Sequence, residues 1–401
     1  MLHAAAVHNT DRILTTHVGS LVRPPEFRRI LEARRDGGPF DQAEYERVLR
    51  QSVIDVVRNQ GDAGIDIVSD GEFGKSIHWA AYVLNRMSGL EYRPTDYFAA
   101  SPMAQSKDMI EFPDFYPEYM ASQGFENEGA GGWECTGALT YTGQAELQRD
   151  IDNITAGLAE VDVVGGFLPV VAPASVAGVG WSESPYATEE EFVYAVADAL
   201  RVEYEAILDA GLILQVDDAF LPWTYDLMVP PATMDEYRAW AQLRVDALNH
   251  ALKGLPEDRV RYHICWGSFN TPHVGDVPAK DIIDLVLQVN AGSYLIEMAN
   301  PRHEHEWRIW EDVKLPDGKV LIPGVITHQT NVVEHPELVA ERLTRLAKLV
   351  GRENVQGGTD CGFSQGPFAN RVHESIQWAK LRSLSEGAEI STRELWAGVP
   401  A

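Results

Sequence analysis

The segment RYHICWGSFN, residues 261–270, carries a histidine and a cysteine two positions apart, at the end of a short apolar run typical of a strand. In an extended strand, side chains at positions i and i+2 point to the same side, so His263 and Cys265 would face one point. Imidazole and thiolate are both ligands that zinc accepts. Taken alone the pair is weak evidence, because a buried histidine and cysteine in the wall of a core have the same spacing.

Two further residues strengthen the metal interpretation. Glu297 ends the strand-like run GSYLIE, and Cys361 follows the run ENVQGGTD. With His263 and Cys265 they complete a set of thiolate, imidazole and carboxylate ligands, which suits a catalytic zinc ion better than a structural one. The chain has only three cysteines, too few for a disulfide framework, and we interpret the third, Cys135, as packing.

Short β-rich runs alternate with longer stretches of helical periodicity along the chain. Eight segments read as strands: 12–20, 64–70, 165–173, 211–218, 259–265, 292–297, 320–327 and 353–360. Helical patterns include 43–60, 188–210, 233–253, 279–289, 334–350 and 373–386. This alternation predicts an α/β fold, a (β/α)8 TIM barrel. A doubly wound open sheet would show the same alternation, but no GxGxxG motif follows the first strand to support it.

Polar, chemically capable residues gather at the carboxyl ends of the predicted strands. Besides the four candidate ligands, these positions hold His17, Asp70, Glu72, Asp217, Asp218, His328, Asn331 and Asp360. In a barrel all of these ends face one mouth, which is where barrel enzymes place their sites. We therefore expect one shared active site. Asp360 and Asp218 are expected to support it or to serve as structural residues.

Residues 88–160 do not fit the short connections of a regular barrel. Within them 103–137 is rich in aromatic residues, Pro and Gly, and poorly periodic. Long barrel insertions usually lie over the site. We expect residues 1–401 to form a single barrel domain, with a long insertion after the second βα unit and 97–137 as a lid or accessory element.

Composition limits the classes of partner. The formal net charge of -27 argues against nucleic acid, whose binding depends on Lys and Arg, and disfavours strongly anionic substrates. There is no apolar run long enough to cross a bilayer, and the first residues do not resemble a signal peptide. We expect a cytoplasmic protein that acts on small molecules. The sequence leaves the oligomeric state open, a homo-oligomer included.

Seven motifs, in the same order as in a known family, identify the sequence as similar to the catalytic barrel of cobalamin-independent methionine synthase. They are TTHVGSLVRP, GIDIVSDGEFGK, LILQVDD, HICW, YLIEMANPRHE, PGVITHQTNVVEHPE and GGTDCG. The resemblance runs from Thr15 to about Trp396, outside the 97–135 region. It implies a stand-alone barrel with zinc as cofactor, which transfers an alkyl group, most specifically a methyl group, to a thiol such as homocysteine. The zinc-bound thiolate would be the nucleophile.

The resemblance also implies roles for individual residues. The family's zinc ligands fall on His263, Cys265, Glu297 and Cys361. Its catalytic histidine falls on His328, and Glu72 and Asp217 act with it. Contacts to the thiol substrate fall on Gly19, Ser20, Glu72 and Asp217, with a basic position at Arg302. His17, an addition to the family motif, has two interpretations, a substrate contact or a hydrogen bond in the core.

Departures from the family leave the reaction partners open. The segment APASVAGVGW only loosely resembles the family's folate-contacting stretch, and the strong negative charge suits a polyglutamylated folate poorly. The alkyl donor and the thiol acceptor therefore remain unassigned. The alternatives are thiol addition to an epoxide or another small electrophile, a metal-free decarboxylase or lyase related to uroporphyrinogen decarboxylase, and a non-catalytic thiol binder. The segment NPRHEHEWRIWED suggests either a second metal site or, as we expect, a helix with a solvated face.

Overall fold

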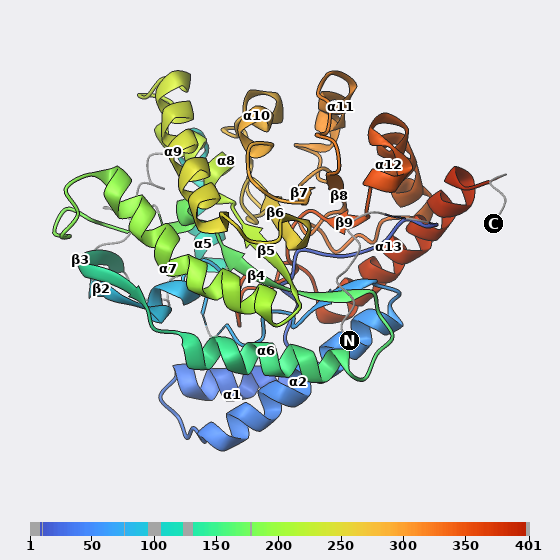
Figure 1. Ribbon diagram of the computed structural model, residues 1–401. Coiled ribbons are helices and arrows are strands. Elements are labelled where there is room, and N and C mark those ends of the chain that lie inside the picture. Colours follow the sequence, from blue (N-terminus) through green and yellow to red (C-terminus); the bar gives the residue numbers. More distant parts are fainter. Residues whose placement is uncertain are drawn as a thin grey trace.

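Seven short parallel strands form the main sheet, and helices cover its outer side (Figure 1). The computed structural model describes residues 9, 11–75, 77–94, 106–122, 131–176 and 179–397. The strands, in the order in which they lie in the sheet, are β1 (Ile67–Ser69), β4 (Gly165–Val171), β5 (Ile213–Asp217), β6 (Val260–Ile264), β7 (Ser293–Ile296), β8 (Val320–Ile326) and β9 (Gly358–Thr359). Spatial order follows chain order, as in a barrel of repeated β-α units.

The N-terminal segment closes the sheet into a ring. The amide of Ile67, in β1, donates to the carbonyl of Thr15 at 3.1 Å, and the amide of Thr16 donates to the carbonyl of Gly357, beside β9, at 2.9 Å. Residues 14–16 therefore occupy the eighth strand position between the two edges, although they form only an isolated bridge. The predicted (β/α)8 architecture is confirmed. The predicted strand 12–20 is shorter than expected because the chain turns at Gly19, where φ is 131°.

The helices pack around this ring. They are α1 (Pro25–Arg35), α2 (Gln42–Asp62), α6 (Gln144–Leu158), α7 (Glu189–Asp209), α8 (Phe220–Met228), α9 (Met234–Leu252), α10 (Ile283–Val286), α11 (Ile309–Asp312), α12 (Pro336–Val350) and α13 (Glu374–Leu395). Local signals set several starts: Asp41 accepts the amides of the first turn of α2, and Thr233 and Glu236 form a capping box on α9. Among the described residues, we find no helix both long and apolar enough to span a membrane.

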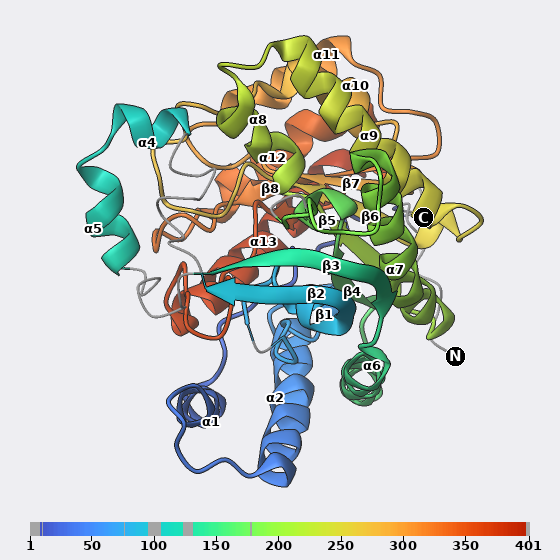
Figure 2. The same cartoon turned by 90° about the vertical axis from the view of Figure 1, so that its left-hand side faces the viewer.

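The predicted insertion lies between β1 and α6. It contains an antiparallel pair, β2 (Met87–Pro94) with β3 (Gly131–Tyr141), and two short helices, α4 (Lys107–Glu111) and α5 (Phe115–Ser122). Figure 2 shows α4 and α5 on one side of the molecule, away from α2 and α6. Positions 97–105 and 123–130 of the predicted lid lie outside the described residues. The insertion thus precedes the helix of its own unit.

A polar layer fills the barrel interior below the strand ends. Arg261 is 2% exposed, and its guanidinium donates to Gln215 at 2.7 Å and to the hydroxyl of Thr16 at 2.8 Å. The amide nitrogen of Gln215 in turn donates to Asp217 at 2.7 Å. Barrel interiors are more often filled by branched apolar side chains. Here the hydrogen-bonded layer fixes Asp217 at the mouth of the barrel.

Candidate active site

Three side chains of types that can bind a metal ion meet at the carboxyl ends of β6 and β9. One ligand atom each of His263, Cys265 and Cys361 lies within 4.8 Å of the other two, and the two sulfur atoms are 3.9 Å apart. His263 is in β6, Cys265 follows that strand, and Cys361 follows β9. All three residues are at most 7% exposed. The structure therefore brings together three of the four predicted ligands.

The orientation of His263 is that of a metal ligand. Its Nδ1 lies 3.3 Å from the carbonyl oxygen of Leu295 in β7. Because a carbonyl only accepts, Nδ1 carries the proton and Nε2 is left with its lone pair. Nε2 is buried and has no hydrogen-bond partner among the described residues. Burial lowers the pKa of His263, which favours the neutral form that binds metals. An orphaned nitrogen beside two thiols fits a zinc ion.

The two thiols influence each other. The hydrogen bond from Cys265 lowers the pKa of Cys361, while the same bond, together with burial, raises the pKa of Cys265. Ala219 and Trp79 pack against the pair. A thiol of lowered pKa next to a second buried thiol can lose its proton when a metal ion binds.

Glu297, the fourth predicted ligand, lies in a neighbouring group with His328 and Asp360. One carboxylate oxygen of Glu297 accepts the backbone N–H of Trp266 at 3.0 Å, and the other accepts the side-chain amide of Asn300 at 2.5 Å. Burial raises the pKa of Glu297 to about 7, although nearby His303 and His273 oppose the shift. Its carboxylate is thus held by protein donors.

His328 is a buried imidazole that makes no hydrogen bond to the described residues. It is 0% exposed, and neither ring nitrogen has a hydrogen-bond partner among the described residues. Burial lowers its pKa well below the ordinary value, so the ring is neutral at pH 7. Asp360 accepts the amides of Met298 and Ala299 at 2.8 and 2.7 Å with one oxygen, which makes it a support for the loop after β7. A neutral, unpaired imidazole can exchange protons with a ligand.

Two acidic residues border the site. Glu72 follows β1 in a left-handed conformation with φ of 60°, and its carboxylate lies 3.0 Å from the ammonium of Lys75. Asp217 ends β5, and burial raises its pKa to about 7. A Cβ on Gly19 would lie 3.1 Å from Glu72 Oε1, so a glycine there permits this close approach. Ser20 is also buried here, and its Cβ would be 2.8 Å from a Cβ built on Gly362.

Two predicted substrate contacts, His17 and Arg302, make hydrogen bonds to the protein itself. The Nε2 of His17 hydrogen-bonds to the side chain of Gln60 at 2.7 Å, and its Nδ1 accepts the amide of Gly19 at 3.1 Å. This geometry favours the core interpretation of His17. Arg302 is exposed, and its guanidinium donates to the carbonyl of Val274 at 3.2 Å, outside the buried group.

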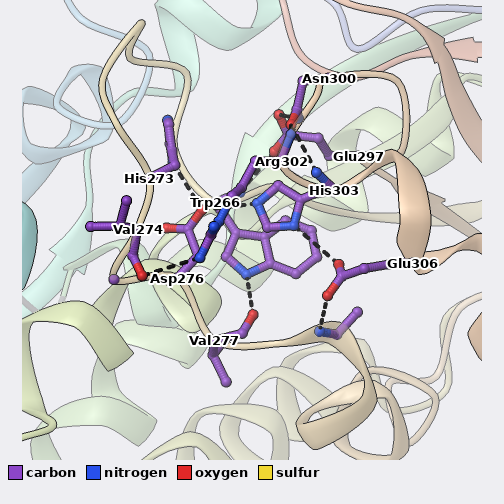
Figure 3. A network of polar contacts seen from close by, with 12 residues as sticks. Trp266, His273, Val274, Asp276, Val277, Glu297, Asn300, Arg302, His303 and Glu306 are labelled. Atoms are coloured by element: carbon purple, nitrogen blue, oxygen red, sulfur yellow. Dashed lines mark hydrogen bonds and ion pairs between the residues drawn. The ribbon is translucent and has the colours of Figure 1, made fainter.

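A buried network behind Glu297 was missed by sequence reasoning (Figure 3). His303 donates to Glu306 at 3.0 Å and to Asp276 at 2.8 Å, and its ring stacks on Trp266 with centroids 3.9 Å apart. The same oxygen of Asp276 accepts from His273 at 3.0 Å. The interpretation of this segment as a solvated helix face is wrong for His303 and Glu306, which are both buried. Their i, i+3 spacing was the available signal, but the partner Asp276 comes from another loop.

Comparison with known proteins agrees with this architecture. A family model described as the catalytic domain of cobalamin-independent synthase matches residues 13–95 and 172–379, which is more than half of the chain. The chain is 24% identical over 389 residues to the uncharacterized protein YxjH of Bacillus subtilis, covering 92% of each. It is 22% identical over 389 residues to the methionine synthase of Sulfolobus acidocaldarius, covering 95% of this chain and 93% of that protein.

Solved structures show the same fold. A B12-independent methionine synthase from Shewanella sp. W3-18-1, in complex with selenomethionine, superposes with a TM-score of 0.69 at 19% identity, covering 96% of this chain and 99% of that one. A putative vitamin-B12 independent methionine synthase from Listeria monocytogenes gives a TM-score of 0.64 at 18% identity, covering 95% and 98%. The chain belongs to the family of the cobalamin-independent synthase catalytic domain.

Proposed function

We propose that the protein is a zinc-dependent enzyme that transfers a methyl group to a small thiol of the homocysteine type. At a coarse level, the family and its methionine synthase relatives support a thiol methyltransferase. The observation that carries the proposal is the group of His263, Cys265 and Cys361, in which a buried, unpartnered imidazole nitrogen faces two thiols. Glu297 is the proposed fourth and exchangeable ligand.

The zinc ion, when bound, would lower the pKa of the substrate thiol so that it reacts as a thiolate at neutral pH. The protein residues handle the proton. We assign His328 to accept the thiol proton, because its neutral ring is buried and neither ring nitrogen has a hydrogen-bond partner among the described residues. The substrate sulfur then forms a bond to the methyl carbon as the bond from that carbon to the leaving group breaks. His328 returns the proton to the leaving group.

Acidic side chains orient the thiol substrate. Glu72 and Asp217 are both at most 5% exposed and would bind a substrate ammonium group, as in an amino-acid thiol. Gly19 and Ser20 would provide close backbone contact beside Glu72. Arg302 would act from the rim of the site, and His17 would support Gly19 from the core.

We further propose that the described part of the insertion that contains α4 and α5, residues 106–122, covers the site. Asp108 of α4 accepts the amides of His273, Val274 and Gly275, in the loop that follows Cys265. A pocket between the insertion, α8 and this loop is lined by aromatic residues that include Trp223 and Trp266. The insertion is therefore connected to the backbone of the loop that follows Cys265.

Metal content tests the proposal. Wild type purified without chelator is expected to contain about one zinc per chain, and Cys361→Ser is expected to lose most of it. Cys135→Ser is the matched control, since Cys135 is buried but lies in β3, outside the group. A wild type that contains no zinc and gains none from added zinc would refute the thiol-activation mechanism. Metal retained fully by both Cys361→Ser and Cys265→Ser would refute the ligand assignment. Methylation of homocysteine is then measured with candidate donors.

A further inference from the structure

The side chain of Asn300 has only one orientation compatible with its surroundings. Its oxygen accepts two backbone amides, from Arg302 at 2.8 Å and from His303 at 3.0 Å. The amide group therefore cannot be flipped, because a flip would turn an NH2 group toward two N–H donors. The nitrogen of Asn300 consequently faces Glu297 and donates to it at 2.5 Å.

The second donor to Glu297 is fixed as well. Trp266 offers its backbone N–H from the position next to Cys265. The indole of this residue donates to the carbonyl of Val277 at 2.7 Å and stacks on the His303 ring at an interplanar angle of 18°. Figure 3 shows the stacked rings between Asp276 and Glu306. His303 thus supports both donors, through its backbone N–H to Asn300 and its ring against Trp266.

Geometry also gives His303 a positive charge. Both ring nitrogens face carboxylate oxygens, which only accept, so both carry protons. The same holds for His273, whose ring faces Asp276 and the carbonyl of Phe269. Two imidazolium rings and the carboxylates of Asp276 and Glu306 balance in charge. The network is thus a closed set of ion pairs that holds the turn at 300–303 rigidly behind Glu297.

We propose that Asn300 and the Trp266 amide form a latch that stabilises the withdrawn position of the exchangeable ligand Glu297, in competition with its position on an ion bound by His263, Cys265 and Cys361. Asn300 is then a positioning residue. By withdrawing Glu297, the latch keeps one position of a bound ion available to the substrate thiol. The inference rests on the proposed function, since it concerns the same metal group, and it adds the residue that controls how readily a thiol enters.

The test uses Asn300→Ala, loaded with Co²⁺ as a spectroscopic substitute for zinc. Without the latch, Glu297 is expected to stay on the ion for a larger fraction of the time, so the visible absorption bands of cobalt change and the metal dissociation constant, measured by chelator competition, decreases. Homocysteine should bind on the order of tenfold more weakly, which corresponds to the loss of about one hydrogen bond to a charged group. In the Glu297→Gln background, Asn300→Ala should have no further effect on either readout.

Two additional variants keep the result interpretable. Asn153→Ala is the matched control, because Asn153 is also buried, at 4% exposed, but lies in α6. Asn300→Ser can still accept the backbone amides but is too short to reach Glu297, so it replaces Asn300→Ala if that variant does not fold. Unchanged cobalt spectra and unchanged thiol affinity in a folded Asn300 variant would overturn the latch and leave the proposed function intact. A wild type that binds no metal would instead overturn the proposed function.

Discussion

Asp108 holds the insertion to the active-site loop, and replacing it should loosen that loop selectively. The carboxylate is 5% exposed and accepts three consecutive backbone amides, at 2.6 Å from His273, 2.8 Å from Val274 and 3.0 Å from Gly275. Hydrogen bonds to charged groups contribute roughly 1.5–3 kcal/mol each, and such contributions do not add fully when they share one acceptor. We therefore expect Asp108→Ala to cost about 3 kcal/mol.

This cost should appear as local opening and not as global unfolding. The three amides lie in a connection outside the strands and helices, and the barrel core does not depend on them. If the free energy of opening this loop falls by about 3 kcal/mol, backbone hydrogen exchange at residues 273–275 should become roughly a hundredfold faster. Hydrogen exchange measured by mass spectrometry tests this.

The controls separate this effect from a general one. Asp114→Ala changes an exposed carboxylate of the same insertion and should leave the exchange unchanged. Asp108→Asn keeps one acceptor oxygen and should give an intermediate rate. Equal protection of residues 273–275 in wild type and a folded Asp108→Ala variant would refute the view that this carboxylate fastens the loop.

Three other perturbations have defined outcomes. Burial lowers the pKa of His17 to about 4, so the unfolded state binds a proton at higher pH than the folded state. The free energy of unfolding should therefore fall by up to about 3 kcal/mol as pH decreases from about 6.5 to about 4. Urea denaturation should show a shallower fall for His17→Gln than for wild type, and equal slopes would contradict this assignment. Gly19→Ala should destabilise by roughly 1–3 kcal/mol and weaken thiol binding by calorimetry, because φ is 131° and Pro169 would be 3.0 Å from the new Cβ; an unchanged denaturation midpoint would argue against strain. His328→Gln should keep or raise the melting temperature, because no described partner is lost, but slow methyl transfer by roughly 10²–10⁴-fold; full activity would remove His328 from the mechanism.

Much of the architecture could be predicted because it depends on local pattern. Each of the eight predicted strands coincides with one position of the ring, and the ligand spacing in β6 follows from the two-residue period of a strand. Boundaries were less predictable. The last strand is reduced to Gly358–Thr359, and the predicted helix 279–289 is reduced to a 3-10 turn followed by Ile283–Val286. Tertiary packing and short connections, which local propensity does not contain, set these limits.

For the candidate site, the sequence predicts which residues lie at the mouth of the barrel but not the contacts between them. The position of Glu297 depends on donors from two loops, Trp266 and Asn300, and no spacing in the sequence encodes that contact. The hydrogen bond of His17 to Gln60 likewise joins residues 43 positions apart. The network of His303 was missed because its shared carboxylate, Asp276, lies 27 positions earlier.

The closure of the ring by residues 14–16 has a consequence for folding during synthesis. The amide of Val18 donates to the hydroxyl of Thr359, 341 positions further along the chain. The N-terminal segment can therefore make this contact only after residue 359 has been synthesised. Contacts of such high sequence separation form late and slowly. Cys361 lies just after Thr359, whereas His263 lies in β6 and Cys265 directly follows it, so both are synthesised earlier. A nascent chain therefore presents His263 and Cys265 well before Cys361 is made, so the proposed three-residue metal group can be complete only once the ring has closed.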